Sequence, residues 1–171
     1  GANSDYTIVA ASALSQFNDR ILELIADVVL HPSFPENEVE LAKQNTKESL
    51  RQQRAQPSFL ASEMVSRVMF GEHPYSVVAP TPESIDRSSR EEFVKFHRKK
   101  FVPNSAVFII VGDVRYDHIH RRIESLFSTW ESGEELVTNF PAPPVRTRRT
   151  AYLIDRHGSA QSNIVIANSG I

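Results

Sequence analysis

The sequence predicts an α+β fold, in which an antiparallel-rich sheet carries several helices packed on it. Two apolar patterns lead to this prediction. Most of the chain repeats apolar residues at the three- and four-residue spacing of one helix face, whereas a few short runs are rich in β-branched residues, as strands are. One such run, 106–111, is continuously apolar between turn residues, which is typical of a central strand covered on both faces. The other predicted strands are 6–14, 150–154 and 162–167.

Two helices joined by a proline-containing turn are predicted after the first strand. The segment 16–30 carries apolar residues at helical spacing and is expected to face the core. The segment 35–53 starts at Pro35 with acidic residues in its first turn, which a helix N-terminus favours. It is much more polar, and the apolar stripe that we expect it to bury consists of Val39, Ala42, Thr46 and Leu50.

Two more helices are predicted in the middle of the chain. Pro57 begins the third helix, and Gly71 stands where a left-handed C-terminal cap is expected. The segment 74–82 is predicted to be a loop. A capping sequence at 88–92 starts the fourth helix. Its buried side is expected to hold Phe93, Phe96 and Phe101.

The C-terminal third is predicted to contain a domain boundary. A fifth helix follows from Tyr116, with apolar residues at periodic positions up to Trp130. The segment 131–147 includes a glycine and several prolines and is predicted to be a linker. We therefore expect an α+β module at 1–130 and the first strands of a following part at 148–171.

The composition is globular and excludes several kinds of chemistry. With 171 residues, 40% of them hydrophobic and 23% charged, the chain is long enough to bury a core. It contains no cysteine, which excludes thiol nucleophiles, disulfides and thiolate-bound zinc. The formal charge of −2 favours neither nucleic acid nor an anionic membrane. No apolar run reaches the ~18 residues of a spanning helix, so we expect a soluble chain or a targeting segment outside it; the compartment is not predicted.

Six histidines are the candidate metal ligands, and their spacing does not favour a site. His118 and His120 are the only close pair, but on a helix they point about 200° apart. His73, next to Glu72 and near Tyr75, could act in proton transfer. We favour the interpretation that this segment is a loop packed through Tyr75. No Gly-x-Ser-x-Gly motif supports a serine hydrolase. The other histidines are His31, His97 and His157.

Four motifs in succession give the chain a resemblance to a known family. They are Phe34-Pro35-Glu36-Asn37-Glu38, Gly71-Glu72-His73-Pro74-Tyr75, Phe93-Val94-Lys95-Phe96-His97 and the segment 101–113. Their order and spacing resemble the pitrilysin/insulinase-type zinc peptidases, most of all the non-catalytic, mitochondrial-processing-peptidase-like members. The resemblance implies a two-layer fold and a zinc site built from H-x-x-E-H on one helix and a glutamate on a later helix. H-x-x-E-H is absent from this chain, so the module 1–130 would lack its first strands and that ligand helix.

The resemblance also implies where the glutamate ligand would lie. An ungapped match places it at Ser49 and the preceding conserved acid at Ala42, and neither residue is acidic. Glu48 is one residue away, but it would need a slip in the helix to take the same position. We therefore predict no catalytic, cofactor-binding or metal-binding residue in this chain, with Glu48 as the one alternative ligand. Glu48 is expected to be exposed, and Ser49 to lie nearer the packed side.

Three functions remain open. The favoured one is a non-catalytic half or subunit that forms part of a substrate chamber, enclosing a peptide or unfolded polypeptide for a homologous zinc endopeptidase partner. The second is a fragment of an active zinc metalloendopeptidase, in which zinc-bound water is the nucleophile. The third is a structural scaffold subunit. The chain alone is expected to need no cofactor, to bind neither nucleic acid nor membrane, and to form a homodimer or exchange elements between copies.

Overall fold

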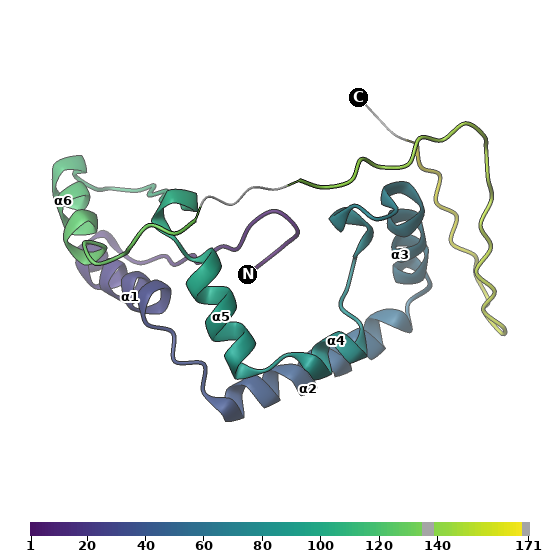
Figure 1. Cartoon of the computed structure of the whole chain (residues 1–171), viewed down its shortest axis with the longest axis horizontal. Coiled ribbons are helices and arrows are strands. Elements are labelled where there is room, and N and C mark those ends of the chain that lie inside the picture. The colour runs from purple at the N-terminus through teal and green to yellow at the C-terminus, as the bar shows by residue number, and fades with distance from the viewer. Residues whose placement is uncertain (135–138, 169–171) are drawn as a thin grey trace. The chain divides into compact units, whose positions relative to one another are not determined.

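The computed structural model describes residues 1–134 and 139–168. The chain divides into two compact units. Unit 1 comprises Gly1–Glu36 and Ser89–Val137, and unit 2 comprises Asn37–Ser88 and Thr138–Ile171. Figure 1 shows that helices and extended segments make up the described part of the chain.

The predicted antiparallel-rich sheet does not form, so the α+β prediction is wrong. Among the residues described, no strand is present and the single β-bridge joins Ala2 to Thr7. In the segment 106–111, Val107 and Ile109 are 85% and 79% exposed. A β-branched run favours an extended backbone, but a strand also needs a neighbour that exchanges ladder hydrogen bonds with it. Within residues 1–134 and 139–168, the predicted strands have no such neighbour beyond the single bridge at Thr7.

The described residues of unit 1 contain three α-helices, and two of these confirm the predicted helices 16–30 and 116–130 in type and position. Helices α1 and α6 pack side by side (Figure 1). The side chains that they and the nearby segments bury are Leu22, Ala26, Val29, Val102 and Ile119. The elements are η1 (Ser15–Phe17), α1 (Asn18–Leu30), α5 (Arg90–Lys100), η3 (Pro103–Ser105) and α6 (Tyr116–Leu126).

Ion pairs join α1 to α6 at the edge of this core. Asp19 and Glu23 lie one turn apart on α1, and His118 and Arg122 lie one turn apart on α6. His118 Nε2 is 2.9 Å from Asp19 Oδ1, and the Arg122 guanidinium pairs with Glu23. Because these pairs are partly exposed, we expect them to fix the register of the two helices more than to stabilise them.

The turn after α1 is held in place by α5. Phe34 has a φ of +43°, which is uncommon for a residue with a side chain. Arg90 donates hydrogen bonds from Nε to the Phe34 carbonyl at 2.9 Å and from Nη2 to the Ser33 carbonyl at 3.1 Å. The Phe34 ring stacks on Phe93 with centroids 6.1 Å apart. Phe93 and Phe96 are nevertheless 36% and 51% exposed, so the prediction that both are buried is wrong.

The described part of unit 2 confirms two predicted helices and contains two short ones, η2 and α4, that were not predicted. Gly71, with a φ of +58°, ends α3 as expected. The predicted loop 74–82 is only partly correct, because it contains the short helix η2 and the start of α4. Thr81 and Ser84 form a reciprocal capping box at the N-terminus of α4. The bounds are Glu36–Arg54 (α2), Pro57–Phe70 (α3), Pro74–Ser76 (η2) and Pro82–Arg87 (α4).

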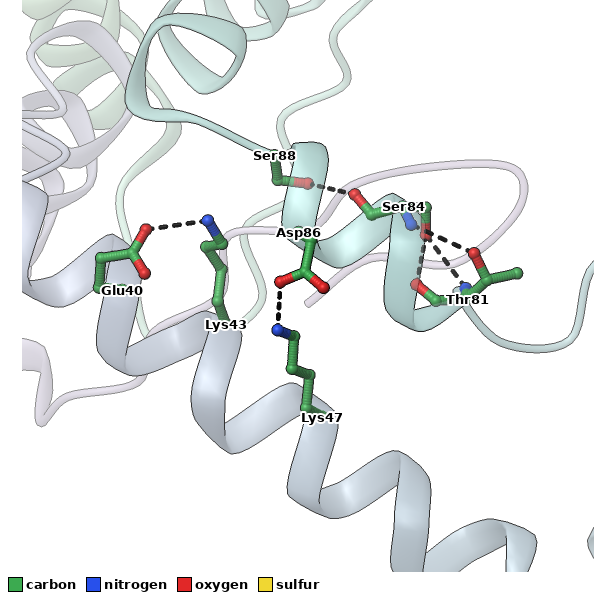
Figure 2. Close-up of polar contacts among 7 residues, drawn as sticks. All are labelled: Glu40, Lys43, Lys47, Thr81, Ser84, Asp86 and Ser88. Atoms are coloured by element: carbon green, nitrogen blue, oxygen red, sulfur yellow. Dashed lines mark hydrogen bonds and ion pairs between the residues drawn. The ribbon is translucent and has the colours of Figure 1, made fainter.

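The side of α2 that packs differs from the predicted stripe. Val39 and Leu50 are buried as expected, but Ala42 and Thr46 are exposed. Figure 2 shows that Lys47 reaches from α2 to Asp86 on α4 and forms an ion pair with it. Within the described residues, no helix is both long enough and apolar enough to cross a membrane.

Acid is expected to destabilise the fold by protonating two carboxyl groups of α4, those of Glu83 and Asp86. The hydrogen bond from Lys47 lowers the pKa of Asp86. The backbone N–H of Glu83, at the N-terminus of α4, lowers the pKa of that carboxyl in the same direction. Each carboxyl group binds fewer protons in the folded chain than in the unfolded chain. Its ionised form therefore stabilises the fold at pH values above the unfolded pKa, about 4, and this stabilisation is lost as the pH falls through the folded pKa.

Urea unfolding followed by ellipticity, from about pH 6 to about pH 3, checks this expectation. Asp86→Asn should give a shallower fall in unfolding free energy with acidification than the native chain. Asp113→Asn, which removes an exposed carboxyl elsewhere, is the control and should leave the slope as it is. Equal slopes for the native chain and Asp86→Asn would show that Asp86 does not contribute.

Candidate functional site

The exposed face of α2 carries the two positions at which the family resemblance implies acids. Ala42 and Ser49 both lie on this face and both are exposed. Ser49 Oγ accepts a hydrogen bond from Gln53 Nε2 at 3.0 Å. Glu48 is exposed as expected, and its carboxylate is 3.4 Å from the Arg51 guanidinium. Ser49 is exposed as well, so the expected difference in burial between Ser49 and Glu48 is absent.

A shallow hollow of 270 Å³ lies over Ser49. Neutral polar side chains of α2 line one side of it, and Leu50 and the loop residues Ala79 and Pro80 supply apolar surface. No charged side chain lines it. The remaining lining residues are Asn45, Thr46 and Gln53.

Sequence reasoning did not single out Asn45 and Gln53, although a signal was present. Asn45, Ser49 and Gln53 recur every four residues, which places neutral hydrogen-bonding groups along one helix face. Thr46 is less available, because its hydroxyl donates to the Ala42 carbonyl at 2.7 Å. The hollow therefore offers amide groups and a hydroxyl over an apolar floor, which suits an uncharged ligand such as peptide main chain.

His73 is held in an aromatic cluster of unit 2. Its Nδ1 accepts a hydrogen bond from the Tyr75 backbone N–H at 3.2 Å. Its ring lies 4.6 Å from the Tyr75 ring and 5.5 Å from the Phe140 ring, both edge to face. These contacts agree with the interpretation of this segment as a packed loop. The His73 nitrogen that faces Tyr75 also caps the N-terminus of η2.

Three other histidines contact separate partners. His118 pairs with Asp19, whereas His120 Nδ1 is 3.3 Å from Glu124. His97 Nε2 is 2.7 Å from the Val29 carbonyl, at the C-terminal end of α1. A zinc site needs three or four converging donors, and across residues 1–134 and 139–168 no three His, Asp or Glu side chains converge. The described residues therefore do not fit a zinc ion.

Two models of one peptidase family match the chain. The model described as insulinase, peptidase family M16, matches residues 2–81, and the model described as the peptidase M16 inactive domain matches residues 87–170. Together they define the chain as part of a peptidase-family protein, in which the inactive-domain match is limited to residues 87–170. It belongs to the insulinase family of peptidases, M16, which confirms the family resemblance.

Relatives in several bacteria and in mammals agree with this assignment. A zinc protease of Mycobacterium leprae is 25% identical over 83% of this chain and 31% of its own length. The zinc protease YmxG of Bacillus subtilis is 19% identical over 99% of this chain and 40% of its own length. The mitochondrial-processing peptidase subunit alpha of Rattus norvegicus is 30% identical over 67% of this chain and 22% of its own length. The chain thus spans less than half the length of these relatives.

Proposed function

We propose that this chain belongs to a non-catalytic half or subunit of an M16 peptidase, which forms part of the chamber in which a zinc-binding partner cleaves a polypeptide. The observation that carries this proposal is the chemistry of the exposed α2 face, where Ala42 and Ser49 replace the two acids that the family resemblance implies. The match to the inactive-domain model supports it independently.

The hollow over Ser49 supports a role in holding substrate. A hydrogen-bonding, uncharged surface would contact an extended peptide through its main chain, which every sequence shares. Such contacts favour binding of many polypeptides without a preference for one side chain. A chamber wall needs this property, because the catalytic partner selects the bond to be cut.

Zinc content tests the proposal against the alternative that Glu48 is a ligand. We expect the dialysed chain to hold well under about 0.1 equivalent of zinc by elemental analysis, because its described donors do not converge. Glu48→Gln and the control Glu40→Gln, on the same helix and also exposed, should leave this value unchanged. About one equivalent of zinc, lost in Glu48→Gln and kept in Glu40→Gln, would overturn the proposal and revive the active-fragment alternative.

Co-expression with an M16 homologue that carries H-x-x-E-H, from the same organism, tests the partner role. The two chains should elute together in size-exclusion chromatography, and cleavage of an internally quenched peptide should exceed that of the homologue alone. Replacing the glutamate of H-x-x-E-H in the homologue should remove cleavage and leave co-elution intact. Co-elution without any gain in cleavage would favour the scaffold alternative instead.

We also expect the chain to self-associate in the absence of such a partner. Several large apolar side chains are exposed, among them Val111 at 92% and Leu153 at 95%. Exposed apolar side chains favour association when they form a patch. Light scattering at two concentrations about a hundredfold apart should show a mass that rises with concentration. A strictly monomeric chain at the higher concentration would contradict the expected homodimer.

A further inference from the structure

Helix α5 has one packed face and one exposed, basic face. On the packed face, the His97 ring lies 4.7 Å from the Phe101 ring and contacts the Val29 carbonyl. On the other face, Lys95, Arg98 and Lys99 are exposed; these three residues are the basic face of α5. They line an open hollow of 490 Å³ together with Arg90, Glu91 and Val94.

The charge of the basic face is not balanced by its surroundings. Within residues 1–134 and 139–168, no acidic side chain pairs with Lys95, Arg98 or Lys99, and their side chains make no hydrogen bond. Glu91 is the only acid that lines the hollow. It lies in the first turn of α5, where its own backbone N–H and the Ser89 side chain engage its carboxylate.

Helix electrostatics account for part of this positive charge and leave a repulsion among the three cations. Arg98 and Lys99 lie in the last turn of α5, where positive charge interacts favourably with the helix dipole. Lys95 lies a turn earlier, four residues after Glu91, where opposite charges attract, but also three and four residues from the other two cations, where like charges repel. An anionic ligand in the hollow would remove this repulsion.

We propose that the basic face of α5 is a docking site for an acidic segment of a polypeptide. Carboxylates match both kinds of cation present, and the Arg98 guanidinium can bind one of them through two hydrogen bonds. Recognition of acidic motifs by clustered cations is a recurrent mode of peptide binding. Val94 adds an apolar contact for the stem of a glutamate side chain.

The same observations argue against other polyanions. Lys95 to Lys99 covers little more than one helical turn, about 6 Å, which is short for a groove that follows a phosphate backbone. No aromatic side chain lines the hollow, so bases have no stacking surface there. The chain carries a net charge of −2, which weakens its attraction to a long nucleic acid or an anionic membrane. Docking at α5 does not depend on the proposed chamber role of α2.

Fluorescence anisotropy with a fluorescein-labelled peptide of about ten residues, rich in glutamate, tests the proposal. The chain should bind it at about 50 mM salt and lose affinity at about 300 mM. The triple variant Lys95→Glu, Arg98→Glu, Lys99→Glu should bind about tenfold or more weakly. The matched control Arg115→Glu, Arg121→Glu, Arg149→Glu makes the same change in net charge at exposed positions on other segments and should bind within about twofold of the native chain.

Three outcomes would overturn the proposal. One is equal binding by the two triple variants, provided that both show native ellipticity. Another is equal binding of a peptide in which glutamine replaces every glutamate. The third is tighter binding of a single-stranded oligonucleotide that is lost in the α5 variant, which would assign the basic face to nucleic acid.

Discussion

Replacing Leu22 by alanine is expected to lower the free energy of unfolding by about 2–5 kcal/mol, the largest effect that we predict. Leu22 is only 3% exposed and lies on the face of α1 that is buried with Ala26 and Val29. Truncation removes apolar contacts and leaves a cavity, because neighbouring helices close only part of the space. The eight residues of the hydrophobic core are divided between two units, so unit 1 has few other contacts to compensate.

Leu24→Ala is the matched control, because it removes the same atoms from the same helix at a side chain that is 49% exposed. It should cost less than about 1 kcal/mol. Urea unfolding followed by ellipticity at 222 nm compares the two variants with the native chain. Similar losses for Leu22→Ala and Leu24→Ala would mean that the buried face of α1 is not the one described here.

Replacing Gly133 by alanine is expected to cost about 1–3 kcal/mol. A Cβ at this position would lie 2.5 Å from Val102 Cγ1, and Val102 is itself only 4% exposed. The Asn104 side chain holds Gly133 in place by donating to its carbonyl at 3.1 Å and accepting from its N–H at 3.0 Å. The added methyl group therefore forces either Val102 or this pair of hydrogen bonds to shift.

A double-mutant cycle with Val102→Ala separates the clash from other effects. Val102→Ala alone creates a cavity, and the alanine at 133 would fill part of it. The double variant should be more stable than the sum of the two single changes predicts, by about 0.5–3 kcal/mol. Strict additivity would show that the Cβ does not meet Val102.

The helices of this fold were largely predictable from local signals. Asn18–Leu30 combines an apolar face with a stop at His31-Pro32, and Pro57–Phe70 starts at a proline and ends at a glycine with positive φ. Both kinds of signal act within one or two turns of the chain, so a single sequence contains them. The turn around Phe34 was also predictable from the neighbouring prolines, but the positive φ of Phe34 was not. That conformation depends on the Arg90 hydrogen bonds, which come from a residue 56 positions away.

One missed helix, α4, carries the residue that pairs with Lys47 of α2. Thr81-Pro82-Glu83-Ser84 carries an N-terminal cap and a proline at the first helical position, so α4 had a local signal, but the helix is only six residues long. Its Asp86 provides the partner that brings Lys47 toward the packed side. When α4 is not taken into account, the spacing of apolar residues along α2 places Ala42 and Thr46 on the packed side instead. This long-range ion pair is a contact that periodicity alone does not reveal.

The sheet and the site show different limits of sequence reasoning. The run 106–111 has strong β-propensity, but strand formation depends on partners that no local pattern specifies. The exposed position of Glu48 was predicted correctly from helix geometry. The hollow over Ser49 was not, because Ala79 and Pro80 close it from a loop some thirty residues along the chain.

Trp130 gives unit 1 its own optical reporter. It is the only tryptophan of the chain, its indole Nε1 donates to the Phe101 carbonyl at 3.0 Å, and its ring lies 5.4 Å from that of Phe127. Indole emission therefore follows the unfolding of unit 1 alone, while far-UV ellipticity follows the helices of both units. Coincident transitions in the two signals would show that the units unfold as one cooperative body, and separate transitions would give each unit its own free energy of unfolding.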